Sequence, residues 1–108
     1  MYNIQGTTIT LTRGDSFYCH LDLKRNGQAY TPDDGDVIRF ALKKDYFDTN
    51  ALISQTIPND TLILCLLPAD TKTLAFGTYV YDIEITFENG DVDTFINEAK
   101  FIIAPEVI

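Results

Sequence analysis

The chain has 108 residues, a length typical of one domain, and we expect a single domain over residues 1–108. Hydrophobic residues make up 45% and charged residues 22%, which excludes a disordered chain, and Thr, Ile and Val together supply 29 residues, which favours strands. Sixteen acidic against eight basic residues give a net charge of −8, which argues against binding to nucleic-acid phosphate or anionic lipid.

The first half of the chain contains three stretches in which apolar and polar side chains alternate. Residues 8–12, 17–24 and 37–43 each show this period of two, which predicts three half-buried strands. Asn26-Gly27 is typical of a hairpin turn, and residues 32–36 form a second polar turn. Repeated short strands separated by turns favour a β-sandwich.

The second half predicts further strands. Residues 52–57 form a short one, and residues 61–67 form one that is buried on both faces or central in its sheet. The clearest pattern is residues 79–87, after which Asn89-Gly90 predicts a two-residue hairpin. Residues 92–103 return along this strand, with an irregularity around residues 97–99.

One helical turn is predicted near residues 69–75. Pro68 can begin it, Asp70 or Thr71 can cap it, and Gly77 can end it. Asp70, Gly77 and Tyr79 resemble the corner that leads into strand F of immunoglobulin-like domains, where a tyrosine hydroxyl binds upstream backbone. The predicted fold class is therefore all-β, an immunoglobulin-like antiparallel β-sandwich of 7–8 strands.

The sequence indicates no catalytic, cofactor-binding or metal-binding residues. His20 is the only histidine and is expected on the outer face beside Asp22. Cys19 and Cys65 are either two buried thiols or a disulfide, and one His with two Cys cannot complete a zinc site. We expect no cofactor and no enzymatic activity.

Three short polar motifs have a structural and a functional interpretation. The Arg13-Gly14-Asp15 tripeptide matches an integrin-binding motif, but a turn with Gly14 at positive φ is the favoured explanation. Asp33, Asp34 and Asp36 suggest a fragment of a calcium loop or a solvated turn. A third set of acids is expected to line an exposed strand face and its hairpin, as a solubility device: Asp82, Glu84, Glu88, Asp91 and Asp93.

Five aromatic residues fall outside the predicted core. Aromatic side chains anchor many protein interfaces, so these five are candidate interface residues as well as candidates for simple packing. They are Tyr18, Tyr30, Tyr46, Phe47 and Phe76.

Several segments together resemble a family of small β-sandwich proteins encoded among the tail and baseplate genes of phages and prophages of Gram-positive bacteria. The matching segments run over nearly the whole chain: Thr12-Arg13-Gly14-Asp15-Ser16, Asn26-Gly27-x-x-Tyr30, Gly35-Asp36-x-Ile38-x-Phe40, Pro68-x-Asp70-Thr71-x-x-Leu74-x-x-Gly77-x-Tyr79-x-Tyr81-Asp82-Ile83, Asn89-Gly90-Asp91-Val92-x-Thr94 and Phe101-x-Ile103-x-x-Glu106-Val107. These motifs are mostly turns and core residues, so they specify a fold more firmly than an activity.

The resemblance implies a non-enzymatic virion component or assembly module that acts through contacts with other phage structural proteins and with copies of itself. It also implies synthesis and assembly in the host bacterial cytoplasm, which agrees with an N-terminus that has no signal-peptide pattern. Two alternatives stay open. One is a sandwich that binds carbohydrate or a cell surface, and the other is an acidic inhibitor that imitates the charge of DNA.

Overall fold

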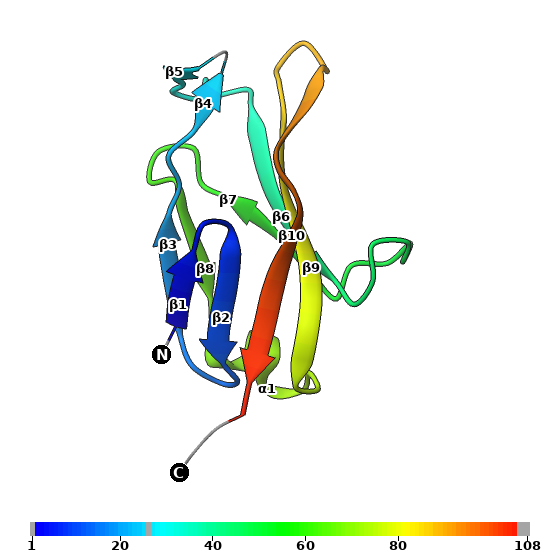
Figure 1. Cartoon of the computed structure of the whole chain (residues 1–108). Coiled ribbons are helices and arrows are strands. Elements are labelled where there is room, and N and C mark those ends of the chain that lie inside the picture. The colour runs from blue at the N-terminus through cyan, green and yellow to red at the C-terminus, as the bar shows by residue number, and fades with distance from the viewer. Residues whose placement is uncertain (1, 26, 106–108) are drawn as a thin grey trace.

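The protein is mostly β, with ten strands and one short helix in the part of the chain that the structure describes (Figure 1). A computed structural model describes residues 2–25 and 27–105, except for the side chains of residues 3 and 25. The elements are β1 (Tyr2–Gln5), β2 (Thr8–Thr12), β3 (Phe17–His20), β4 (Lys24–Arg25), β5 (Gln28–Ala29), β6 (Val37–Lys43), β7 (Ile53–Ile57), β8 (Ile63–Leu66), α1 (Pro68–Lys72), β9 (Gly77–Thr86) and β10 (Val92–Ala104).

Six strands form one mixed sheet in the order β1-β2-β10-β9-β6-β7. All of its pairings are antiparallel except that of β10 with β2, which is parallel and runs from Phe101 opposite Ile9 to Ala104 opposite Thr12. The expectation of an antiparallel sandwich was therefore wrong at this pair. The first hairpin and the last strand meet only in the folded chain, and local sequence carries no signal for their relative direction.

The remaining strands form two small sheets. β3 pairs with β8, from Phe17 opposite Leu66 to His20 opposite Ile63, and β4 pairs with β5. The β3–β8 sheet packs on the large sheet through Phe17, whose ring meets that of Phe101 at 6.3 Å between centroids. Buried side chains from the large sheet and from the β3–β8 sheet form a single apolar core, in which the rings of Phe40 and Tyr81 also pack against Phe101.

The strand count exceeds the predicted seven or eight because three short strands were not expected. β1 forms a hairpin with β2, and Gln5 pairs with Thr8 across a two-residue turn in which Gly6 has a φ of +60°. β4 and β5 flank the predicted turn at Asn26-Gly27, and Arg25 pairs with Gln28. Asn26 itself lies outside the described residues.

Two predicted strands need correction. The strand expected over residues 17–24 ends at His20. Leu21 N–H still donates to Leu62 O (2.8 Å) in register with the β3–β8 ladder, but Leu62 has a φ of +54°, which interrupts the partner strand at this point. The strand expected over residues 61–67 covers only Ile63–Leu66, lies beside β3 alone and exposes Ile63, so it is neither central nor buried on both faces.

The hairpin between β9 and β10 has a three-residue loop where a two-residue loop was expected. Phe87 N–H donates to Asp91 O (2.7 Å), Gly90 N–H donates to Phe87 O (2.8 Å), and Gly90 has a φ of +95°. This combination is a type I turn followed by a residue in the left-handed region. The predicted irregularity at residues 97–99 is confirmed, since the register shifts there and Glu98 has a φ of +52°.

The predicted helical turn near residues 69–75 is the five-residue helix α1, three residues shorter at its C-terminal end. Asp70 closes its first turn by accepting a hydrogen bond from Leu67 N–H (2.7 Å). Gly77, with a φ of +145°, then starts β9, and the buried Tyr79 donates its hydroxyl to Ala75 O (2.6 Å). The hydrogen bond expected of a corner tyrosine is thus confirmed.

Within the described residues, no helix has the length and apolar content that crossing a membrane requires.

Candidate functional site

The five candidate interface aromatics lie on four separate segments of the chain, and among them only Tyr46 and Phe47, which are neighbours on one loop, contact each other (ring centroids 5.3 Å apart). Tyr18 projects from β3 and is exposed. Tyr30 is half-buried, with its ring against Phe87, and is therefore a packing residue. Phe76 is partly exposed, but the Arg13 guanidinium lies over its ring at 4.2 Å. The structure thus offers one exposed aromatic pair and no aromatic groove among these five residues.

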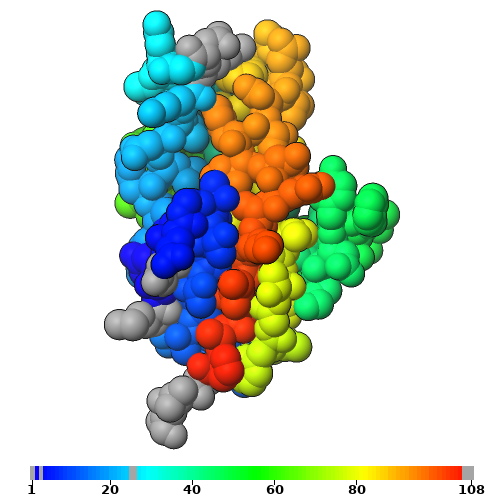
Figure 2. Space-filling view, in the orientation of Figure 1, coloured from blue at the N-terminus to red at the C-terminus, as the bar shows by residue number. Residues whose placement is uncertain are grey.

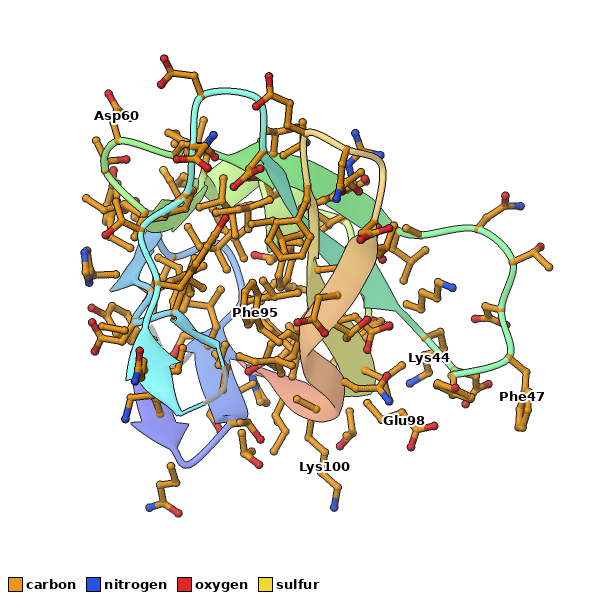
Figure 3. The ribbon with its side chains drawn as sticks, turned by 90° about the horizontal axis from the view of Figure 1, so that it is seen from above. Lys44, Phe47, Asp60, Phe95, Glu98 and Lys100 are labelled. Carbon is orange, nitrogen blue, oxygen red and sulfur yellow. The ribbon has the colours of Figure 1, made fainter. Side chains whose placement is uncertain are left out.

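The Tyr46-Phe47 pair sits on a loop between β6 and β7 that projects from the side of the molecule, shown in green in Figure 2. Phe47 is 89% exposed, and Figure 3 shows its side chain at the outer end of the loop. Two hydrogen bonds order the loop, from Asp48 N–H to Asp45 O and from Asp45 N–H to the Asp48 carboxylate (both 3.1 Å). This loop holds an apolar ring in solvent at a defined position.

The Arg13-Gly14-Asp15 tripeptide forms a turn between β2 and β3. Gly14 has a φ of +82°, and its N–H donates to the buried Thr71 hydroxyl at 2.9 Å. Arg13 covers the Phe76 ring and donates to Leu74 O (3.4 Å). The tripeptide therefore fastens the β2–β3 turn to the segment around α1, which fits the turn interpretation.

Asp36 is the centre of a buried hydrogen-bond cluster. Its side chain is 4% exposed and accepts three hydrogen bonds, from Tyr30 O–H (2.5 Å), Asp33 N–H (3.0 Å) and Glu88 N–H (3.1 Å). Both carboxylate oxygens are thus engaged within the protein, while Asp33 and Asp34 are exposed. This cluster ties the loop before β6 to the β9–β10 hairpin. No group of three possible metal ligands was found among the described residues.

The acidic residues of the β9–β10 hairpin do not all act as solvated surface. Asp82 accepts a hydrogen bond from Glu98 N–H (2.8 Å), so its carboxylate supports the irregular backbone of β10. Glu84 lies opposite both Arg39 of β6 and Thr94 of β10, at a half-exposed position. Glu88, Asp91 and Asp93 are exposed, as expected.

Residues of the β1–β2 hairpin, β9, β10 and the segment after β3 surround an apolar cavity of about 320 Å³. Its lining includes Ile9, Leu21, Ile83, Phe95 and Ile96. In Figure 3, Phe95 lies between the ribbon of β10 and the strands β3 and β4. Sequence reasoning missed this site, although two adjacent apolar residues just before an irregularity in a strand were a usable signal for it.

Two of the polar groups at this cavity have pKa values that burial raises. Cys19 is a free, half-buried thiol, and burial raises its pKa, with a further rise from the Asp22 charge. Burial likewise raises the pKa of Tyr81 to about 12, and its hydroxyl donates to Thr7 O. His20 is exposed, with Nδ1 3.6 Å from a carboxylate oxygen of Asp22, as the alternation predicts. A protonated thiol is a weak nucleophile.

Comparisons with protein-family models, with curated proteins and with solved structures give no match for this chain.

Proposed function

We propose that this chain is a non-enzymatic structural or assembly module of a phage or prophage particle, of the tail or baseplate type. It acts through contacts with other phage structural proteins and with copies of itself, in a particle assembled in the host cytoplasm. The proposal is supported by the resemblance of the turn and core motifs to those of small β-sandwich proteins encoded among phage tail and baseplate genes. Tyr79 and Gly77 belong to those motifs; the Tyr79 hydroxyl donates to Ala75 O, and Gly77 has a φ of +145° at the start of β9.

The observation that carries the proposal is the exposed Tyr46-Phe47 loop. Burying a phenylalanine side chain that is fully exposed contributes about 1.5–3 kcal/mol to binding. The hydrogen bonds between Asp45 and Asp48 already order the loop, so the loop would lose little conformational entropy when a partner binds it. A projecting, ordered aromatic loop favours a role as an anchor in a protein interface.

We also propose that the fold is related to the immunoglobulin-like sandwich. The support is the Tyr79 corner and the packing of a small sheet against a large one. The carbohydrate-binding alternative receives less support. It requires several aromatic side chains in one groove, whereas the five candidate aromatics lie on four separate segments of the chain. The DNA-mimic alternative requires acids ordered on one surface, whereas Asp36 and Asp82 hold backbone amides.

The proposal is tested in a phage-producing bacterial culture that carries the gene. Lysates are fractionated by sedimentation, and the chain is quantified in the particle, tail-intermediate and free-protein fractions. We expect the chain with particles or intermediates, and we expect Phe47→Ser to lower this share at least fivefold. Tyr18→Ser, which alters another exposed aromatic residue, is the control and should behave like the unaltered chain.

Two results would count against the proposal. If the unaltered chain stays with free protein, it is not a particle or assembly component. If Phe47→Ser sediments like the unaltered chain, the loop is not the anchor.

A further inference from the structure

The upper part of β10 has an edge that no strand covers within residues 2–25 and 27–105. β10 has 13 residues, but β2 pairs only with its last four, Phe101–Ala104. Over Val92–Ile96, β9 occupies one side of β10, and the other side has no strand beside it in the described sheet. Figure 1 shows the β1–β2 hairpin ending well below the β9–β10 turn.

The β1–β2 hairpin is fixed at the point where it stops. β2 begins at Thr8, and the turn before it is held by the Tyr81 hydroxyl, which donates to Thr7 O. If β2 were extended beyond this turn alongside β10, the extension would lie over the apolar cavity. The cavity is lined by Thr7 of the turn, by Phe95 and Ile96 of the open part of β10, and by Leu21 and Leu23 of the opposite layer.

An open backbone edge beside an apolar cavity is what strand addition requires. Main-chain hydrogen bonds to the edge provide affinity, and alternate side chains of the added strand enter pockets. Here one face of an added strand would point into the cavity, and the other would point to solvent beside the outer face of β9 and β10. A cavity of about 320 Å³ falls within the range of ligand pockets.

The charge of the hairpin indicates which strand fits. Residues 73–99 contain six acidic residues and no Lys, Arg or His. Asp91 and Asp93 lie on or next to the open edge, and both are exposed. A second copy of the same edge would bring like charges together, which disfavours pairing of two β10 edges. A basic segment would be attracted instead. On the opposite side of the cavity Lys24 and Asp22 carry opposite charges, so the acids on the β10 side dominate this attraction.

We infer that the open edge of β10 at Val92–Ile96 and the adjacent cavity form an acceptor site for an extended segment of a partner protein, in which apolar residues alternate with basic ones. The apolar residues enter the cavity, and the basic residues lie near the acids of the β9–β10 hairpin. The inference rests on the proposed function, because it names the chemistry of one partner contact.

The test uses the full chain and a synthetic seven-residue peptide, blocked at both ends, in which four lysines alternate with valine, isoleucine and valine. A second peptide has the same composition with the three apolar residues adjacent, and a third has glutamates in place of lysines. Binding is measured by titration calorimetry, and amide hydrogen exchange is followed residue by residue by NMR.

We expect the alternating peptide to bind at least tenfold more tightly than either control peptide and to slow exchange of alternate amides within Val92–Ile96 at least tenfold. Asp93→Lys should weaken binding at least fivefold, whereas Asp60→Lys, an equal charge change in the exposed turn between β7 and β8, should leave it unchanged. Cys19→Leu, which fills part of the cavity, should also weaken binding at least fivefold.

The inference is overturned if the peptide does not bind, if it binds without slowing exchange in Val92–Ile96, or if protection appears at another sheet edge. Equal binding of the peptide with adjacent apolar residues would overturn it too, since charge alone would then explain the affinity. Asp93→Lys alters an exposed residue, so it keeps the test decisive even if Cys19→Leu does not fold. The test involves neither Phe47 nor a particle, so its failure is separate from a failure of the proposed function.

Discussion

Replacing Asp36 with alanine is the most demanding test of how the upper part of the molecule is held together. The change removes the acceptor of three hydrogen bonds, from Tyr30 O–H, Asp33 N–H and Glu88 N–H. It also removes a side chain that is 96% buried, so water cannot simply take its place. The loop before β6 and the β9–β10 hairpin would lose their shared carboxylate.

The size of the effect follows from the hydrogen bonds. A hydrogen bond to a charged acceptor contributes about 1.5–3 kcal/mol, but Asp33 and Glu88 are exposed residues whose amides can turn to water. We therefore expect a loss of about 3–4 kcal/mol in the free energy of unfolding, out of the roughly 5–15 kcal/mol typical of a domain. At about 4 °C per kcal/mol, Tm should fall by roughly 12–16 °C.

Urea unfolding and thermal unfolding measure this loss, and amide exchange locates it at Asp33 and Glu88. Asp34→Ala is the matched control, because it removes a neighbouring carboxylate that is exposed, and it should change stability by less than about 0.5 kcal/mol. A loss below about 1 kcal/mol for Asp36→Ala, or equal losses for the two variants, would refute the assignment of Asp36 as the centre of the cluster.

Three further predictions concern the backbone and the tyrosines. Tyr79→Phe removes the bond to Ala75 O and should cost about 1–2 kcal/mol in urea unfolding, and a cost near zero would contradict the corner assignment. The folded-state pKa of Tyr81, about 12, lies above the unfolded value of about 10, so its contribution to stability is complete below pH 10 and is lost as pH rises towards 12. Urea midpoints across this range should fall more steeply for the unaltered chain than for Tyr81→Phe, and equal slopes would contradict the burial of this hydroxyl. Gly14→Ala should cost at least about 1 kcal/mol in thermal unfolding, because the φ of +82° is strained for alanine, whereas the new Cβ would only contact the flexible Lys72 side chain at 3.4 Å. An unchanged Tm would contradict the assignment of this turn to the left-handed region.

The parts of the fold that local patterns determine could be predicted from the sequence. β6 and β9 keep a strict period of two with one buried face, and the Tyr79 corner follows from a helix start, a glycine and a tyrosine at fixed spacing. β1 was missed, although Tyr2 and Ile4 alternate with polar residues ahead of Gly6. A four-residue strand gives too short a pattern to be distinguished from a loop.

The rest could not be predicted because it depends on residues that are far apart in the chain. The parallel pairing of β2 with β10 joins residues about ninety positions apart. Asp36 and Glu88, which its carboxylate binds, are 52 positions apart. The cavity is likewise lined by residues from distant segments, namely the β1–β2 hairpin, β3 and β10. The exposure of Phe47 depends on how far its loop projects from the sheet, which residue types alone do not specify.

Quantitative mass spectrometry of gradient-purified phage particles and tail intermediates tests most directly the claim that this chain is a particle or assembly component. We expect the chain at a fixed ratio to the other structural proteins in one or both preparations. Absence of the chain from both, with all of it recovered as free protein, would contradict the account.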